Sequence, residues 1–213
     1  AAHRNAAGGI LGNAESSEAS SNAGPGIMNG AHALRCEVRD NASTGVLNVA
    51  LVEDSMVTGN AGAGIAGATQ VLRTAVSDND GPGVLGGSIF DSTLSGNHGP
   101  GAHAPALVSH CTVARNAGGG VTGDGAGAVN YSLVSANAGN GLVNLLSANQ
   151  SNILRNWDYA AADTLGSGAL DGAADHRLVA AMKAVEIAKR DDAVAIRVRD
   201  RRAPVQALHG GAL

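Results

Sequence analysis

An asparagine returns along this chain at nearly constant intervals, and this repeat limits the possible folds more than any other feature. The intervals between successive asparagines are 17, 19, 19, 19, 18, 19 and 21 residues. The eight positions are Asn5, Asn22, Asn41, Asn60, Asn79, Asn97, Asn116 and Asn137. A unit of about 19 residues cannot bury an apolar face alone, so the units are expected to stack and bury it together.

Apolar and small residues keep fixed distances from each asparagine, so each distance defines a column of equivalent positions. Glycine stands four residues after the asparagine, at Gly9, Gly26, Gly45, Gly64, Gly83, Gly101, Gly120 and Gly141. An aliphatic or small residue follows each glycine directly, and others stand three and eight residues before the asparagine. A serine, threonine or cysteine stands five residues before it. Positions five and three before the asparagine differ by two, which places them on one face of a strand.

This pattern predicts an all-β solenoid of about eight 19-residue coils over residues 1–156. Successive coils of a parallel solenoid lie about 4.8 Å apart, so the apolar columns become its core. The asparagines are expected to form a ladder of amides that bond coil to coil. Asparagine tolerates a left-handed backbone, and we expect the repeated glycines to supply positive φ at tight corners.

The motif Asn-x-Gly-x-Gly-Val/Ile, followed by a strand like Ser-x-Val-Ser-x-Asn, resembles the right-handed parallel β-helix repeat family of the pectate-lyase-like superfold. The resemblance covers residues 5–156, and the right-handed sense of the coil is part of what it implies. Members of this family include polysaccharide lyases, hydrolases and epimerases, as well as many surface proteins. The resemblance therefore implies a secreted or cell-surface location.

The repeat ends near Trp157, and residues 157–213 have a different composition. They hold 16 of the 32 charged residues of the chain. Residues 173–190 are predicted to form an amphipathic helix and residues 193–199 a strand. We expect this segment to cap the end of the solenoid, because an open sheet edge invites aggregation. Its arginines could instead meet an acidic partner.

Composition excludes several classes of function. The 213-residue chain has 31 glycines, four aromatic residues and a net charge of −4, so a nucleic-acid partner is not expected. No apolar run approaches the roughly 18 residues of a membrane span. No cofactor is predicted, and the oligomeric state is left open. The chain starts with Ala1 and is expected to be a piece of a longer protein.

Two motifs suggest chemistry but are better explained by the repeat. The sequence GxGxxG occurs three times, beginning at Gly62, Gly81 and Gly118, always at the solenoid period and without a following helix, so these are turn glycines. Cys36 and Cys111 share a column four coils apart, about 19 Å at ~4.8 Å per coil. That separation is too large for a disulfide.

Two outward columns are candidate surfaces. The position six before the asparagine alternates in charge, and we expect either a ladder of ion pairs or a stripe that binds a charged glycan. This column runs Arg35, Asp54, Arg73, Asp91, His110, Tyr131 and Gln150. Outward serines and threonines, such as Thr93 and Ser95, are similar to the flat hydroxyl arrays of ice-binding solenoids, but alanine and methionine interrupt them.

The position directly after the asparagine gives the most specific site prediction. It is alanine in six coils, but Asp80 and His98 occupy it in two consecutive coils. We predict that they are neighbours and could act in acid–base catalysis, because a carboxylate orients an imidazole. Asp78 and Arg115 are predicted to join them at the same corner as binding residues. A three-histidine zinc site is not expected, and no metal site is predicted.

These features favour a carbohydrate-associated binding scaffold. A polysaccharide-active enzyme and a purely structural or adhesion segment are the alternatives. The chain shows neither the calcium-aspartate and arginine constellation of the lyases nor the paired aspartates of the galacturonases. The scarcity of aromatic residues also weighs against strong sugar stacking.

Overall fold

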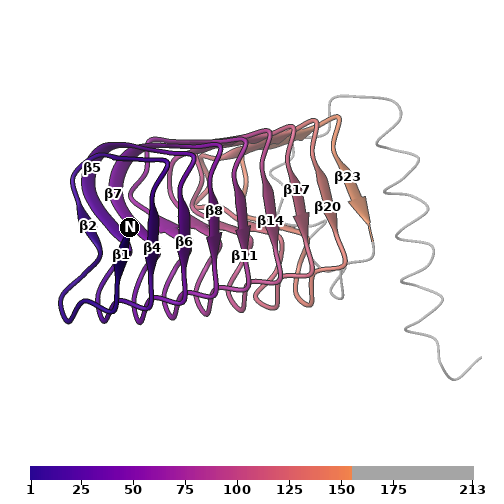
Figure 1. Ribbon diagram of the computed structural model, residues 1–213. Helices are drawn as coiled ribbons and strands as arrows, with labels where there is room; N and C mark the ends of the chain where they lie inside the picture. The colour runs from indigo at the N-terminus through magenta and orange to yellow at the C-terminus, as the bar shows by residue number, and fades with distance from the viewer. Residues whose placement is uncertain (155–213) are drawn as a thin grey trace, which may run out of the picture.

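Each coil contributes short parallel strands to two sheets in the computed structural model, which describes residues 1–154. The first sheet has nine strands, which lie side by side along the length of the solenoid (Figure 1). In spatial order they are β1 (Ala2–His3), β4 (Glu18–Ser20), β6 (Glu37–Arg39), β8 (Met56–Thr58), β11 (Ala75–Ser77), β14 (Thr93–Ser95), β17 (Thr112–Ala114), β20 (Leu133–Ser135) and β23 (Asn152–Leu154). The predicted parallel β-solenoid of about eight coils is therefore confirmed.

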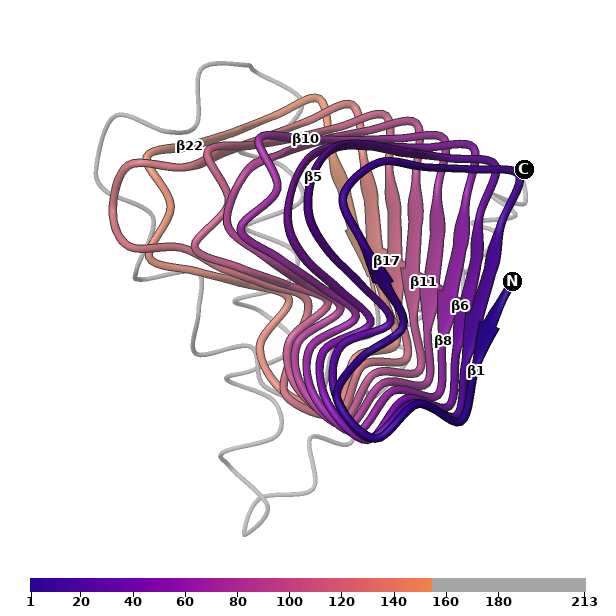
Figure 2. The ribbon, with the colours of Figure 1, turned by 60° about the vertical axis from the view of Figure 1, so that its left-hand side comes forward.

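The second sheet contains two ladders of strands that merge near the start of the chain. One ladder comprises β2 (Ile10–Leu11), β9 (Ile65–Ala66), β12 (Val84–Leu85), β15 (Ala102–His103), β18 (Val121–Thr122) and β21 (Leu142–Val143). The other comprises β3 (Ala14–Glu15), β10 (Gln70–Leu72), β13 (Ser88–Phe90), β16 (Leu107–Ser109), β19 (Ala128–Asn130) and β22 (Ser147–Asn149). The eight-residue strands β5 (Ile27–Leu34) and β7 (Val46–Glu53) belong to both ladders. Figure 2 shows the coils stacked one behind another along the solenoid.

The predicted apolar columns form the core. Three inward columns, at three and eight residues before the asparagine and five after it, fill the space between the sheets. Their side chains are almost completely buried, as at Val57, Val71 and Ile65, which are each 0% exposed. Each fully buried side chain of this size stabilises the fold by roughly 1.5–3 kcal/mol, so a core with few aromatic residues is sufficient.

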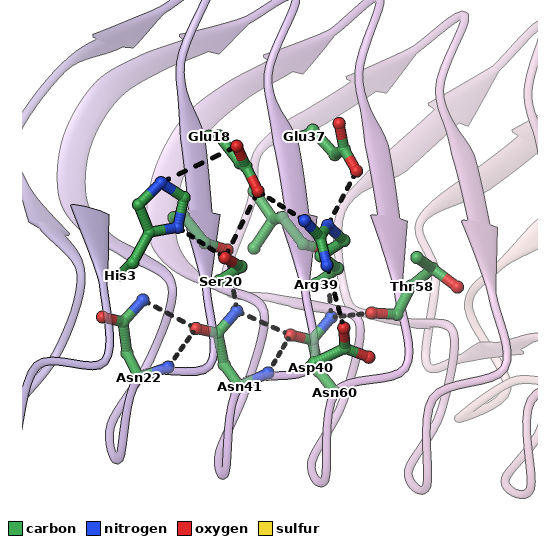
Figure 3. A network of polar contacts seen from close by, with 12 residues as sticks. His3, Glu18, Ser20, Asn22, Glu37, Arg39, Asp40, Asn41, Thr58 and Asn60 are labelled. Carbon is green, nitrogen blue, oxygen red and sulfur yellow. Dashed lines mark hydrogen bonds and ion pairs between the residues drawn. The ribbon is translucent and has the colours of Figure 1, made fainter. Parts of the chain in front are cut away.

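The asparagine ladder is also confirmed, and Figure 3 shows its rungs from Asn22 to Asn60. The Oδ1 atom of Asn41 accepts two hydrogen bonds from Asn22, one from the main-chain N–H at 3.1 Å and one from Nδ2 at 2.8 Å. The same pair of bonds repeats along the stack as far as Asn137, with Nδ2–Oδ1 distances of 2.8–2.9 Å. The side-chain amides are buried at this corner, and their bonds therefore fix the register of each coil against the next.

The repeated glycines have a different reason from the one expected. None of the eight has positive φ, and neither do the ladder asparagines. Instead, a Cβ atom on Gly64 would lie 2.5 Å from Cγ1 of Val76, 2.7 Å from the carbonyl oxygen of Gly83 and 2.8 Å from Nδ2 of Asn79. Glycine is required because the backbone passes directly against the amide ladder, which leaves no room for a side chain.

Positive φ occurs at three other columns. Within residues 1–154, eighteen non-glycine residues adopt it, and all of them lie in the columns one or six residues before the asparagine or seven residues after it. The column six before the asparagine has no glycine at all, and its φ values range from 44° at Arg73 to 54° at His110. The main-chain N–H there donates to the next coil, as from Arg73 to Phe90 at 3.1 Å. These contacts hold a conformation that is unfavourable for L-residues by itself.

The small polar column forms a second inward ladder. Ser55 accepts a hydrogen bond from the main-chain N–H of Cys36 at 3.0 Å, and its hydroxyl donates to the carbonyl of Glu53 at 2.8 Å. Both cysteines are free and occupy this column, as predicted. Burial raises the pKa of the Cys111 thiol to about 11 and also raises that of Cys36. These thiols therefore act as buried small residues and not as nucleophiles at neutral pH.

The predicted boundary and cap at residues 157–213, with the helix at 173–190 and the strand at 193–199, lie outside the described residues. Within residues 1–154, no helix has the length and apolar character that crossing a membrane would need.

Replacing one ladder asparagine tests how much the amides stabilise the solenoid. Asn79→Ala removes the acceptor of two bonds from Asn60 and the donor to Asn97. Because three buried hydrogen bonds are lost and the main-chain N–H of Asn60 stays buried without its acceptor, we expect a loss of about 3 kcal/mol in the free energy of unfolding. Urea denaturation measures this loss. The exposed Asn149→Ala is the control and should change stability by less than about 0.5 kcal/mol; equal effects would show that the ladder has no special role.

A pair of glycine substitutions separates steric crowding from backbone strain. Gly64→Ala places Cβ against three atoms without positive φ, whereas Gly86→Ala places it in open space at φ 81°. We expect Gly86→Ala to cost about 1–2 kcal/mol, the left-handed penalty, and Gly64→Ala to cost more than about 3 kcal/mol because backbone atoms must move. Thermal denaturation of both variants checks the order, and the reverse order would contradict the steric explanation.

Candidate functional site

The backbone of the asparagine corner places Asp80 and His98 one above the other. The N–H of Asp80 donates to the carbonyl of Asn60, and the N–H of His98 donates to the carbonyl of Asn79, both at 2.9 Å. Nδ1 of His98 then lies 3.0 Å from Oδ1 of Asp80. The predicted contact between these two side chains is therefore present.

Asp78 and Arg115 do not join this pair. Both are exposed and lie directly before a ladder asparagine, at φ 55° and 57°. Gly96 occupies the same column between them, and Oδ1 of Asp78 lies over its Cα, where a Cβ would otherwise be. In the part of the chain that the structure describes, no ion pair connects Arg115 to Asp78, Asp80 or His98. The structure thus brings together two of the four predicted site residues.

The chemistry open to this pair is limited by its surroundings. The side chains of His98 and Asp80 are 70% and 59% exposed, so water competes for the hydrogen bond. The pair can exchange a proton with a ligand, but a catalytic site also needs groups that hold and polarise a substrate. Among residues 1–154, no three histidine, cysteine, aspartate or glutamate side chains are arranged to hold a metal ion.

The charge-alternating column forms only part of the predicted ladder. Arg73 pairs with Asp54 one coil earlier, with Nε 2.8 Å from Oδ1, and also contacts Glu53. This hydrogen bond from Arg73 lowers the pKa of the Asp54 carboxyl. After Asp91 the column contains no further aspartate, glutamate, lysine or arginine. Instead, the ring of His110 stacks on that of Tyr131, with centroids 5.0 Å apart. The column is a set of local pairs and not a continuous charged stripe.

A polar network on the outer face of the first sheet was missed by the sequence interpretation (Figure 3). Nδ1 of His3 lies 2.6 Å from the hydroxyl of Ser20, and Nε2 lies 3.7 Å from Glu18. Arg39 contacts three carboxylates, those of Glu18 at 2.7 Å, Glu37 at 2.9 Å and Asp40 at 3.3 Å. Because these residues stand one, two or four positions before successive asparagines, the register of the repeat contained the signal that could have found them.

Two rows of the same face carry no charge in the following coils. From β8 to β20, the outward positions four and two before the asparagine form two rows without an ionisable residue. We call these ten residues the uncharged platform: Met56, Thr58, Ala75, Ser77, Thr93, Ser95, Thr112, Ala114, Leu133 and Ser135. Met56 and Leu133 are 45% and 36% exposed, so each end of one row presents an apolar side chain to solvent.

Comparison with known proteins identifies no relative: no family model, no curated protein and no solved structure matches the chain. The repeat and the geometry of its surfaces are therefore the basis for a functional assignment.

Substitution of the exposed pair tests whether it is needed for the fold. His98→Ala and Asp80→Ala each restore the alanine found at this position in most coils. We expect each to change the free energy of unfolding by less than about 1 kcal/mol, since a contact between two exposed polar side chains contributes little. Chemical denaturation at neutral pH measures the change. A much larger loss of unfolding free energy would show that the pair is needed to stabilise the fold. Its departure from alanine would then need no functional explanation.

Proposed function

We propose that this chain is a non-catalytic β-solenoid scaffold that binds a polysaccharide at the cell surface or after secretion. The observation that carries the proposal is the constant translation from coil to coil, which repeats the same outward positions along the whole first sheet. A linear polymer repeats its own groups at a constant interval. It can therefore make the same contacts with several successive coils.

Rigidity supports this proposal. Binding a polymer along a flexible surface would require the surface to become ordered, which reduces affinity. In this solenoid the amide and hydroxyl ladders hold each coil to the next at 2.8–3.4 Å. The outward side chains are thus presented in fixed rows before a ligand binds. The surface location, and membership of the pectate-lyase-like class, are taken from the resemblance of the repeat.

Polysaccharide cleavage or epimerisation is the second candidate function, and the Asp80–His98 contact favours it. These are the two residues that interrupt a column of alanines, and they are placed within hydrogen-bond distance. Departures from a regular pattern without a structural reason are expected at functional sites. The exposure of both side chains is the reason that the scaffold is preferred.

Binding and turnover assays distinguish these functions. The whole chain is incubated with a panel of neutral and uronic-acid polysaccharides, and both retention and release of products are measured. The scaffold proposal predicts retention on at least one polymer, no products, and equal retention by His98→Ala. Products that disappear with His98→Ala would establish the enzyme instead. Absence of retention on every polymer would contradict the scaffold proposal.

A further inference from the structure

We infer that Ser20 is a nucleophile activated by His3, and that it accepts a small acyl group from an activated ester. This inference goes beyond polysaccharide binding, because it assigns a covalent modification site to the polar network of the first sheet. Three observations carry it: the contact between the serine and the histidine, the carboxylate on the other side of the histidine ring, and the burial of the serine.

The hydroxyl of Ser20 is placed against the imidazole of His3 (Figure 3). Its Oγ atom lies 2.6 Å from Nδ1 of His3, within hydrogen-bond range. The hydroxyl also lies 3.3 Å from Oε1 of Glu18, but that oxygen already accepts a hydrogen bond from Arg39 at 2.7 Å. The nearer acceptor, Nδ1 of His3, is therefore the better one for the hydroxyl proton.

Glu18 lies on the other side of the histidine ring. Its Oε2 atom is 3.7 Å from Nε2 of His3, and Arg39 holds the same carboxylate in place. A carboxylate near Nε2 favours the tautomer with the proton on that nitrogen, which leaves the lone pair of Nδ1 facing Ser20. A serine, a histidine and a carboxylate in this order form the arrangement that activates a nucleophile, and Glu18 is its positioning residue.

The repeat also supplies serines that lack this arrangement. Ser77, Ser95 and Ser135 stand in the same column as Ser20, two residues before the asparagine. His3 is in this column too and pairs in register with Ser20, one coil later. Within residues 1–154 it is the one histidine of the column. The same hydroxyl thus occurs with and without a histidine beside it.

Burial strengthens the contact and limits the size of the reagent. Ser20 is 5% exposed, whereas the other three serines of its column are half-buried. A hydrogen bond in such low-dielectric surroundings is stronger than in water. The side chains of His3 and Glu18 are 44% and 33% exposed, so a reagent can approach from their side. A small acyl group therefore fits this site better than a long one.

The covalent step needs no oxidant, reductant or metal. Oγ of Ser20 attacks the carbonyl carbon of the ester, and the bond from that carbon to the leaving oxygen breaks. The hydroxyl proton passes to Nδ1 of His3 and from there to the leaving oxygen. Ser20 then carries the acyl group as an ester. This is a single modification without turnover, which is compatible with a non-catalytic scaffold.

Acetylation by p-nitrophenyl acetate tests this inference. The whole chain is treated with the reagent, and peptide mapping by mass spectrometry follows each serine separately. Ser20 should react about 100-fold faster than Ser77, the size of effect that a general base supplies. His3→Gln should lower the rate at Ser20 to that of Ser77. The control His103→Gln removes a histidine from the second sheet and should leave the rate unchanged.

The tautomer of His3 tests the role of Glu18. The ¹⁵N chemical shifts of the imidazole report which nitrogen carries the proton, and we expect Nε2. Glu18→Ala should raise the fraction with the proton on Nδ1 and slow acetylation of Ser20, because the lone pair then faces the hydroxyl less often. A merely structural role of Glu18 would leave the tautomer unchanged.

The comparison of two serines in the unsubstituted chain keeps the test independent of whether any variant folds. Equal acetylation of Ser20 and Ser77, an unchanged rate in His3→Gln, or a proton on Nδ1 of His3 in the unsubstituted chain would each overturn the inference. None of these results bears on retention by polysaccharides, so the scaffold proposal is tested separately.

Discussion

The buried amide ladder is the interaction on which the rest of this structure depends. Each Oδ1 atom accepts from the main-chain N–H and from Nδ2 of the preceding asparagine, and Nδ2 also reaches a main-chain carbonyl of the preceding coil, as from Asn79 to Val57 at 3.3 Å. In a low-dielectric interior, such bonds reinforce one another and an unpaired group is costly. A coil displaced by one residue would leave several such groups unpaired. The ladder therefore selects one register, and the apolar columns then stabilise it.

This constraint also explains where the molecule is free to vary. Positions that face the ladder must be glycine, and inward columns must be small or aliphatic, since a Cβ or a larger side chain would collide with the next coil. Positions one, two, four and six before the asparagine, and the one after it, point outward. At positions two and four before the asparagine, the chain places charges in the first coils and uncharged residues from β8 to β20. Function is thus expected in outward rows, and the uncharged platform is one such row of five coils.

The sequence predicted the architecture well because periodicity alone determines it. The core columns and the separation of Cys36 from Cys111 follow from counting residues between asparagines. The role of the glycines did not follow, because Gly64 looks the same in a sequence whether it supplies positive φ or lack of bulk. The contact of Asp80 with His98 could be predicted from one shared column. The separation of Asp78 from Arg115 could also have been predicted, because Gly96 stands between them in the same column. The contacts of Arg39 with three carboxylates could not, because they depend on side-chain conformations that residue spacing does not specify.

Hydrogen exchange of the asparagine side chains tests the central role of the ladder most directly. The Nδ2 protons of Asn41, Asn60, Asn79, Asn97 and Asn116 are buried and bonded between coils. Their exchange, followed by NMR with selectively labelled asparagine, should be as slow as that of the main-chain amides of the core strands, because both need the coils to separate. The exposed amide of Asn149 should exchange rapidly. Rapid exchange of the ladder amides in the folded protein would contradict the conclusion that they hold the coils in register.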